Sequence, residues 1–235
     1  MNLLMTLFNE TIGLIIGTII FCLLSYIVET SDPESGLHKF TKPEVLFYYL
    51  LLTLSSLITN ARFTSVFDRI FFMILLSVLL FHAHTDSKTN QVYRIFSLFL
   101  WIIGFIYTIV RIFIFKCIII NTTNLLIFLI GPTVFIIAMF FTSVLSGWLH
   151  GKGDGYILIA NALFVQFLAI KPGMLTIEPI LIHYIIAALI LIISNPHKIS
   201  FKKARMKERV AYAPSVFAGT LLTMIITGLL WFFCL

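Results

Sequence analysis

The chain has 235 residues, of which 60% are hydrophobic and only 11% are charged. Soluble domains carry about 25% charged residues, and a soluble fold of this size would leave much of this apolar surface in water. The composition therefore excludes an ordinary soluble domain and predicts a membrane protein. The net charge of +6 does not indicate nucleic-acid binding, because the basic residues fall between apolar runs, where they encode membrane topology.

The apolar runs are long and continuous, which predicts helices rather than the alternating strands of a membrane barrel. In chain order, we expect helices near 11–28, 45–60, 66–84, 93–115, 124–149, 155–170, 177–194 and 213–234. The connections between them are short, and no internal repeat is evident. The expected fold class is all-α, with one polytopic transmembrane bundle of about eight helices over residues 1–235.

The Lys and Arg residues are distributed unevenly between the two ends of this predicted bundle. The connections 29–44, 85–92, 150–154 and 195–212 would share one end, with the first turn of the helix that begins near 93. This end carries 11 of the 16 basic residues: Lys39, Lys42, Lys88, Arg94, Lys152, Lys198, Lys202, Lys203, Arg205, Lys207 and Arg209. By the positive-inside rule this end faces the cytoplasm. We therefore expect a multi-pass plasma-membrane protein that contacts lipid headgroups and has both termini outside.

Two acidic residues, Asp86 and Asp154, stand at the edges of apolar runs at the predicted cytoplasmic end. Ionisable side chains at the membrane edge are candidates for functional sites. Two carboxylates at one depth could hydrolyse a peptide bond, since an ionised one activates water and a protonated one hydrogen-bonds the scissile carbonyl. Gly151, Gly153 and Gly155 would let a substrate backbone approach closely. On these residues alone, helix capping is the favoured alternative for both aspartates.

The segments around both aspartates resemble motifs of a known family. The sequence GKGD at 151–154 is similar to the GxGD signature of type IV prepilin peptidases, archaeal preflagellin peptidases and presenilin-type proteases. Asp86 is followed by Thr89 at +3 and Val92 at +6, as in the D-x-x-T-x-x-[IV]-P motif of the prepilin peptidases. The resemblance implies that these intramembrane aspartic peptidases share their fold and chemistry with this chain.

A third segment, RVAYAPSVFAG at 209–219, resembles the P-[FY]-x-P-x-x-x-x-G segment that opens the family's last helix. The resemblance covers roughly residues 66–235, and residues 1–65 form N-terminal helices outside it. It implies that Asp86 and Asp154 are catalytic. It also implies that substrate is positioned by Thr89, Gly151, Gly153, Gly155, Tyr212, Pro214 and Gly219.

The chain also departs from the family pattern. Tyr93, Tyr156 and Ala211 stand where the family usually has Pro, Lys and Pro, and the connection 29–44 lacks the CxxC-containing insert of the methylating members. The resemblance thus implies an aspartic endopeptidase that removes the short basic leader of prepilin-like substrates at the cytoplasmic face, without N-methylation and without a cofactor. The alternatives are an ion- or proton-coupled transporter and a catalytically weak scaffold of a pilus or secretion machine.

Histidines near the two aspartates offer an alternative chemistry. His82 and His84 precede Asp86, and His150 precedes Asp154 by four residues. Histidines beside carboxylates could bind zinc or another divalent ion, but the HExxH signature of membrane metalloproteases is absent. The expected site therefore contains no metal, and the three histidines form the alternative ligand set.

Overall fold

The computed structural model describes residues 3–33, 40–89, 91–111, 130, 133–141, 152–168, 177–195, 199–200, 205–206 and 211–233. Its helices are α1 (Leu3–Ser31), α2 (Lys42–Arg62), α3 (Val66–Thr89), α4 (Arg94–Ile109), α6 (Lys152–Val165), α7 (Ile177–Ser194) and α8 (Ala213–Phe233). Between α7 and α8, the short strands β1 (Ile199–Ser200) and β2 (Arg205–Met206) pair in antiparallel fashion. The expected all-α class is confirmed, apart from this small β pair within the predicted loop 195–212.

Four segments of these helices are long and apolar enough to cross a membrane: Thr11–Ser31, Lys42–Arg62, Val66–Thr89 and Ala213–Leu230. The apolar helices α4, α6 and α7 are shorter. They coincide with the predicted spans 93–115, 155–170 and 177–194, and the predicted helix 124–149 falls largely outside the described residues. The fold therefore indicates membrane association through four helices of spanning length within the described part of the chain.

Several helix boundaries differ from the expected ones in ways that matter for the site. Helix α2 begins at Lys42 rather than near 45, because Thr41 and Glu44 form a reciprocal capping box at its N-terminus. Helix α3 continues to Thr89 instead of ending near 84, and α6 begins at Lys152 instead of 155. The two candidate aspartates therefore lie inside helical turns rather than in the connections between helices.

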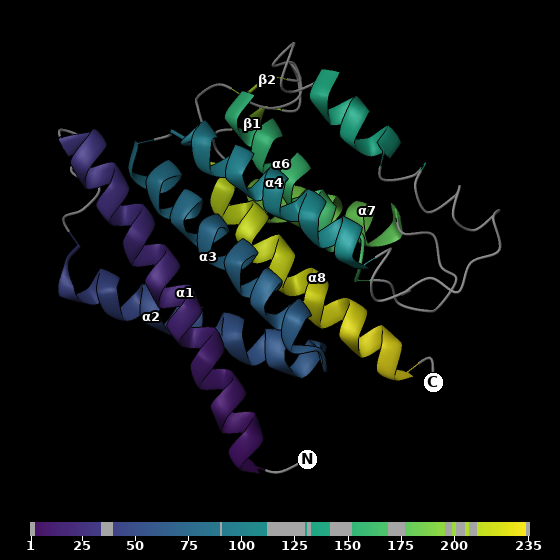
Figure 1. The fold of residues 1–235 in the computed structure, drawn as a ribbon. Coiled ribbons are helices and arrows are strands. Elements are labelled where there is room, and N and C mark those ends of the chain that lie inside the picture. The colour runs from purple at the N-terminus through teal and green to yellow at the C-terminus, as the bar shows by residue number, and fades with distance from the viewer. Residues whose placement is uncertain are drawn as a thin grey trace.

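Helix α3 occupies the middle of the bundle (Figure 1). It packs against α1 and α2 on one side and α8 on the other, and it also contacts α4 and α6. Its side chains are buried almost continuously from Phe72 to Asp86, as expected for a helix surrounded by others. Polar side chains on this helix are consequently held away from lipid by neighbouring helices.

Small residues allow close approach at two of the helix contacts. A Cβ atom added at Gly17 of α1 would lie 2.9 Å from Met73 Cε and 3.0 Å from Ser77 Oγ on α3. A Cβ atom added at Gly104 of α4 would lie 2.8 Å from Leu163 Cβ on α6. Membrane helices commonly pack through small residues in this way, because dispersion contacts replace the hydrophobic effect in lipid.

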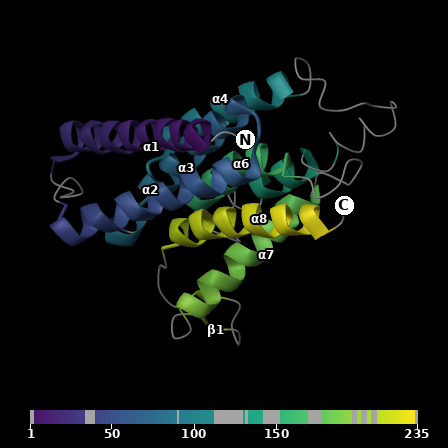
Figure 2. The same cartoon turned by 90° about the horizontal axis from the view of Figure 1, so that it is seen from below.

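One end of the bundle gathers the C-terminal ends of α1 and α3 with the N-terminal ends of α2, α4 and α8. The Tyr93 hydroxyl donates to Asp32 Oδ2 at 3.0 Å there, and Lys88 pairs with Glu44 at 3.1 Å. Helices α2 and α8 start at this end and run in the same general direction (Figure 2), and they approach each other toward their C-terminal ends, where Gly228 lies beside Arg62. The start of α1 and the end of α8 lie toward the opposite end (Figure 1). This shared end, with Asp86 near it, is called the carboxylate end below.

Candidate active site

Asp86 lies in the last turns of α3 and is held by the start of α8. Its Oδ2 atom accepts a hydrogen bond from the backbone N–H of Ala213 at 2.9 Å, and the N–H of Tyr212 also interacts with the carboxylate. Only 4% of Asp86 is exposed. The first N–H groups of a helix have no partner within the helix, so Asp86 caps α8 rather than its own helix. The carboxylate is therefore fixed in position by the third motif segment.

Asp154 lies in the first turn of α6 and is half-buried. It is close enough to Tyr212 to act on its hydroxyl electrostatically. Burial raises the pKa of the Tyr212 hydroxyl, and the Tyr184 hydroxyl and the Asp154 carboxylate raise it further. Tyr212 is thus a neutral phenol at physiological pH, and its backbone N–H interacts with the Asp86 carboxylate. Tyr212, which belongs to the segment 209–219, therefore interacts with both aspartates.

The first two motif segments also touch each other. A Cβ atom added at Gly153 would lie 3.0 Å from Val92 Cβ, so the glycine of the GKGD segment packs directly on the last matching residue of the Asp86 motif. A side chain at 153 would push these segments apart. The close approach, rather than an unusual backbone conformation, accounts for glycine at this position.

The other predicted positioning residues have different surroundings. Thr89 donates its hydroxyl to Thr85 O at 2.8 Å within α3, and Gly155 is buried inside α6. Pro214, in the first turn of α8, is half-buried. Gly219 packs against α7, where an added Cβ atom would lie 3.1 Å from Ala187 Cβ, so its role is helix packing. Gly151 lies outside the described residues.

Two departures from the family pattern have structural partners. Tyr93 links the α3–α4 connection to Asp32 at the end of α1. Tyr156 lies against α4, where its carbonyl accepts a hydrogen bond from Trp101 Nε1 at 2.8 Å and its ring lies 6.0 Å from the Arg94 guanidinium. These tyrosines therefore hold helix ends in place, and neither displaces a carboxylate.

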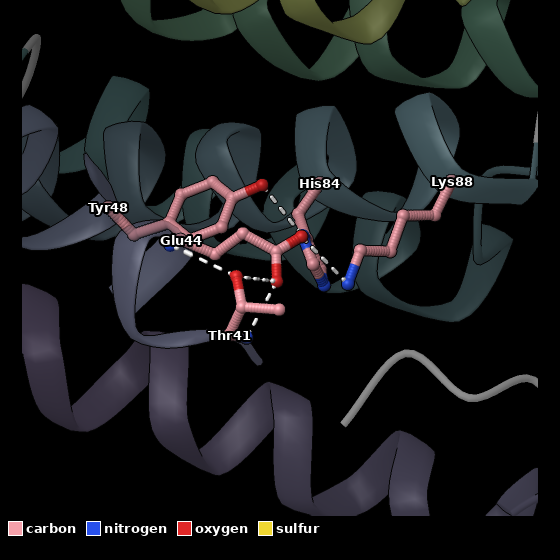
Figure 3. Close-up of polar contacts among 5 residues, drawn as sticks. All are labelled: Thr41, Glu44, Tyr48, His84 and Lys88. Atoms are coloured by element: carbon pink, nitrogen blue, oxygen red, sulfur yellow. Dashed lines mark hydrogen bonds and ion pairs between the residues drawn. The ribbon is translucent and has the colours of Figure 1, made fainter. Parts of the chain in front are cut away.

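A polar cluster that sequence reasoning missed links α2 to the last turns of α3 (Figure 3). Glu44 accepts hydrogen bonds from the backbone and hydroxyl of Thr41 at 2.8 and 3.0 Å and pairs with Lys88. The Tyr48 hydroxyl lies 2.7 Å from His84 Nδ1. The T-x-x-E spacing of a capping box was the one sequence signal that could have revealed part of this cluster. The cluster positions the last turns of α3, and with them Asp86.

The two described histidines of the alternative metal set have separate partners. His82 Nε2 lies 3.2 Å from Ser97 Oγ on α4, whereas His84 contacts Tyr48 on α2. Residues two apart on a helix point to nearly opposite sides, so these imidazoles do not converge. No group of three or more metal-binding side chains occurs within the described ranges. His150 lies outside them.

The geometry therefore defines a class: a helical, membrane-associated protein in which two aspartates share one end of the bundle. The chain matches no protein-family model, no curated protein and no solved structure. A functional interpretation accordingly depends on the motif segments and on their arrangement in this structure.

Proposed function

We propose that the chain is a multi-pass membrane aspartic endopeptidase that removes the basic leader of prepilin-like substrates, with the carboxylate end facing the cytoplasm. The observation that supports it is the meeting of three separate segments around the aspartates. Asp86 accepts a hydrogen bond from Ala213, and Val92 packs on Gly153, the residue before Asp154. Helix capping alone would account for the first of these contacts but not for the second.

In the proposed reaction, Asp86 and Asp154 share one proton. The ionised carboxylate takes a proton from water as that water attacks the scissile carbonyl, and the protonated carboxyl donates to the carbonyl oxygen. The tetrahedral intermediate then collapses: the C–N bond breaks as the proton taken from water passes to the amine nitrogen, and the other carboxylate recovers its proton from the hydroxyl that becomes the product carbonyl. The hydrogen bond from Ala213 restricts the orientation of Asp86, which lowers the cost of reaching the reactive geometry. The pair needs no metal or organic cofactor for this chemistry.

The test uses purified protein in lipid nanodiscs and a synthetic single-span peptide with a short basic leader, a small residue at the cleavage point and an apolar helix. We expect mass spectrometry to detect the helix without its leader, unmethylated when a methyl donor is added, and equally in a chelator. Folded protein that cleaves no such peptide would overturn the proposal. Dependence on a divalent metal would instead favour the histidine alternative.

A second function, a scaffold without catalysis, is favoured by one observation. Asp86 already has a structural task in capping α8, and a cap accounts for a buried carboxylate without any chemistry. The scaffold and the peptidase differ in the cleavage assay. They also differ in the expected effect of Asp86→Asn. The amide oxygen can still accept the Ala213 hydrogen bond, so a scaffold would tolerate this substitution, whereas a peptidase would lose its catalytic carboxylate.

Gly153→Ala is expected to slow cleavage by up to about 10-fold, because a misplacement of about 1 Å can cost ~100-fold and this contact calls for a smaller shift. The added methyl group would meet Val92 Cβ at 3.0 Å and separate the two motif segments. Rates are measured with the single-span peptide, and thermal unfolding serves as the stability control. The double variant Gly153→Ala/Val92→Gly makes room for the methyl group and should recover activity. A double variant as slow as the single one would show that this contact is not the cause.

A further inference from the structure

A groove with a volume of about 500 Å³ lies between α2 and α8, and α3 forms its base. Its base contains Leu80 of α3 and Phe217 of α8, which are 1% and 5% exposed. Its walls are the exposed side chains Phe47 and Leu54 of α2 and Leu222 of α8. The groove is almost entirely apolar, and the exposed side chains of its walls leave it open.

One end of the groove lies next in sequence to the candidate catalytic residue and to its hydrogen-bond partner. Its lining includes Ser87, which follows Asp86, and Pro214, which follows the Ala213 that hydrogen-bonds Asp86. From there the groove follows α2 and α8 toward the opposite end of the bundle. The groove therefore reaches the residues that directly follow Asp86 on α3 and Ala213 on α8.

The dimensions of the groove fit one face of a helix. Its lining extends from Phe47 to Ile58 on α2 and from Pro214 to Ile225 on α8, or roughly 16 Å at a helical rise of ~1.5 Å per residue. A whole helix about 10 Å across would occupy well over ~1,000 Å³ in that length. The groove can thus take the side chains of a helix while the rest of that helix stays in lipid.

We infer that this groove receives the apolar helix of the substrate, a step that rests on the proposed peptidase function. The scissile bond of such a substrate lies just before its apolar helix. A helix that enters the groove with its N-terminal end at Ser87 and Pro214 brings that bond beside Asp86, while the leader stays outside the groove. The substrate helix then runs in the same direction as α2 and α8.

A second apolar groove provides a matched control. It has a volume of about 330 Å³ and lies on the other side of α2, against α1, with Cys22 and Ser25 in its lining. Its lining includes neither Asp86 nor its sequence neighbours, nor any residue of α8. A substrate helix bound there would lie against α1 and α2 and not against α8, whose Ala213 binds Asp86.

The experiment is disulfide cross-linking, which requires Cα atoms within about 7 Å. The background protein has its three cysteines replaced by Ser (Cys22, Cys117 and Cys234) and carries Asp154→Asn, so that the peptide stays intact. One cysteine is then added, either by Ala218→Cys in the α2–α8 groove or by Ser25→Cys in the α1–α2 groove. The single-span peptide carries one cysteine in its apolar helix, and a poly-leucine helix with one cysteine is the comparison. We expect a cross-link from Ala218→Cys, none from Ser25→Cys, and a much lower yield with poly-leucine.

The outcomes test the groove assignment and the peptidase proposal separately. If wild-type protein cleaves the peptide but the cross-link forms only from Ser25→Cys, or from neither position, the groove assignment is wrong and the peptidase stands. If poly-leucine cross-links equally well, the groove accepts any apolar chain and the assignment is also wrong. A selective cross-link from Ala218→Cys without cleavage by wild type supports the groove as a helix-binding site and overturns the peptidase.

Discussion

Asp86→Asn and Asp154→Asn are each expected to reduce the cleavage rate by at least ~100-fold, because general acid–base groups contribute about 10²- to 10⁴-fold. An amide can neither activate water nor donate a carboxyl proton. Both variants should stay folded, since asparagine matches aspartate in shape. At position 86 its amide oxygen can also accept the Ala213 hydrogen bond. Initial rates with the single-span peptide measure the loss, and Glu29→Gln, at an exposed carboxylate of α1, should cleave at the wild-type rate.

Substitutions at Asp86 also separate its two possible roles. Asp86→Ala removes the acceptor for the Ala213 N–H, and the loss of a helix cap costs roughly 0.5–2 kcal/mol of stability. Asp86→Asn should lose activity and keep most of this stability, whereas Asp86→Ala should lose both. If Asp86→Asn cleaves normally and only Asp86→Ala fails, Asp86 is a cap without a catalytic role.

The helices were largely predictable, because long apolar runs bounded by charge leave few alternatives for a chain in lipid. The boundaries that were wrong have identifiable causes. Helix α2 starts early because Thr41 and Glu44 cap it, and this spacing is visible in the sequence. Helix α3 continues past residue 84 to Thr89, where Asp86 and Lys88 have partners on other helices, Ala213 and Glu44. No local pattern contains that information.

The candidate site was predictable as a set of segments but not as a geometry. The motifs pointed to Asp86, Asp154 and Tyr212, but nothing local shows that Asp86 would cap α8. That contact joins residues 127 positions apart in the chain, and it exists only once α3 and α8 have packed. The same is true of the pairing between Tyr48 and His84, which depends on how α2 crosses α3.

Asp68→Ala is expected to lower the free energy of unfolding by roughly 3–5 kcal/mol, the cost of breaking a buried ion pair from one side. Asp68, 4% exposed in the first turn of α3, accepts a hydrogen bond from the Tyr107 hydroxyl at 2.8 Å and pairs with Arg111 at 3.3 Å. Removing the carboxylate leaves a guanidinium and a phenol in apolar surroundings at the end of the bundle opposite Asp86. Denaturant-induced unfolding in detergent micelles measures the loss.

A second substitution tests whether the unpaired charge is the cause of that loss. Replacing a buried ion pair by apolar residues of similar size is often neutral, so Asp68→Leu/Arg111→Met should be more stable than Asp68→Leu alone. Asp32→Ala is the matched control, since Asp32 also accepts from a tyrosine, Tyr93, but is half-buried and lies at the carboxylate end. Its loss should be much smaller. Equal losses for Asp68→Ala and Asp32→Ala would show that the Arg111 pair does not stabilise this end of the bundle.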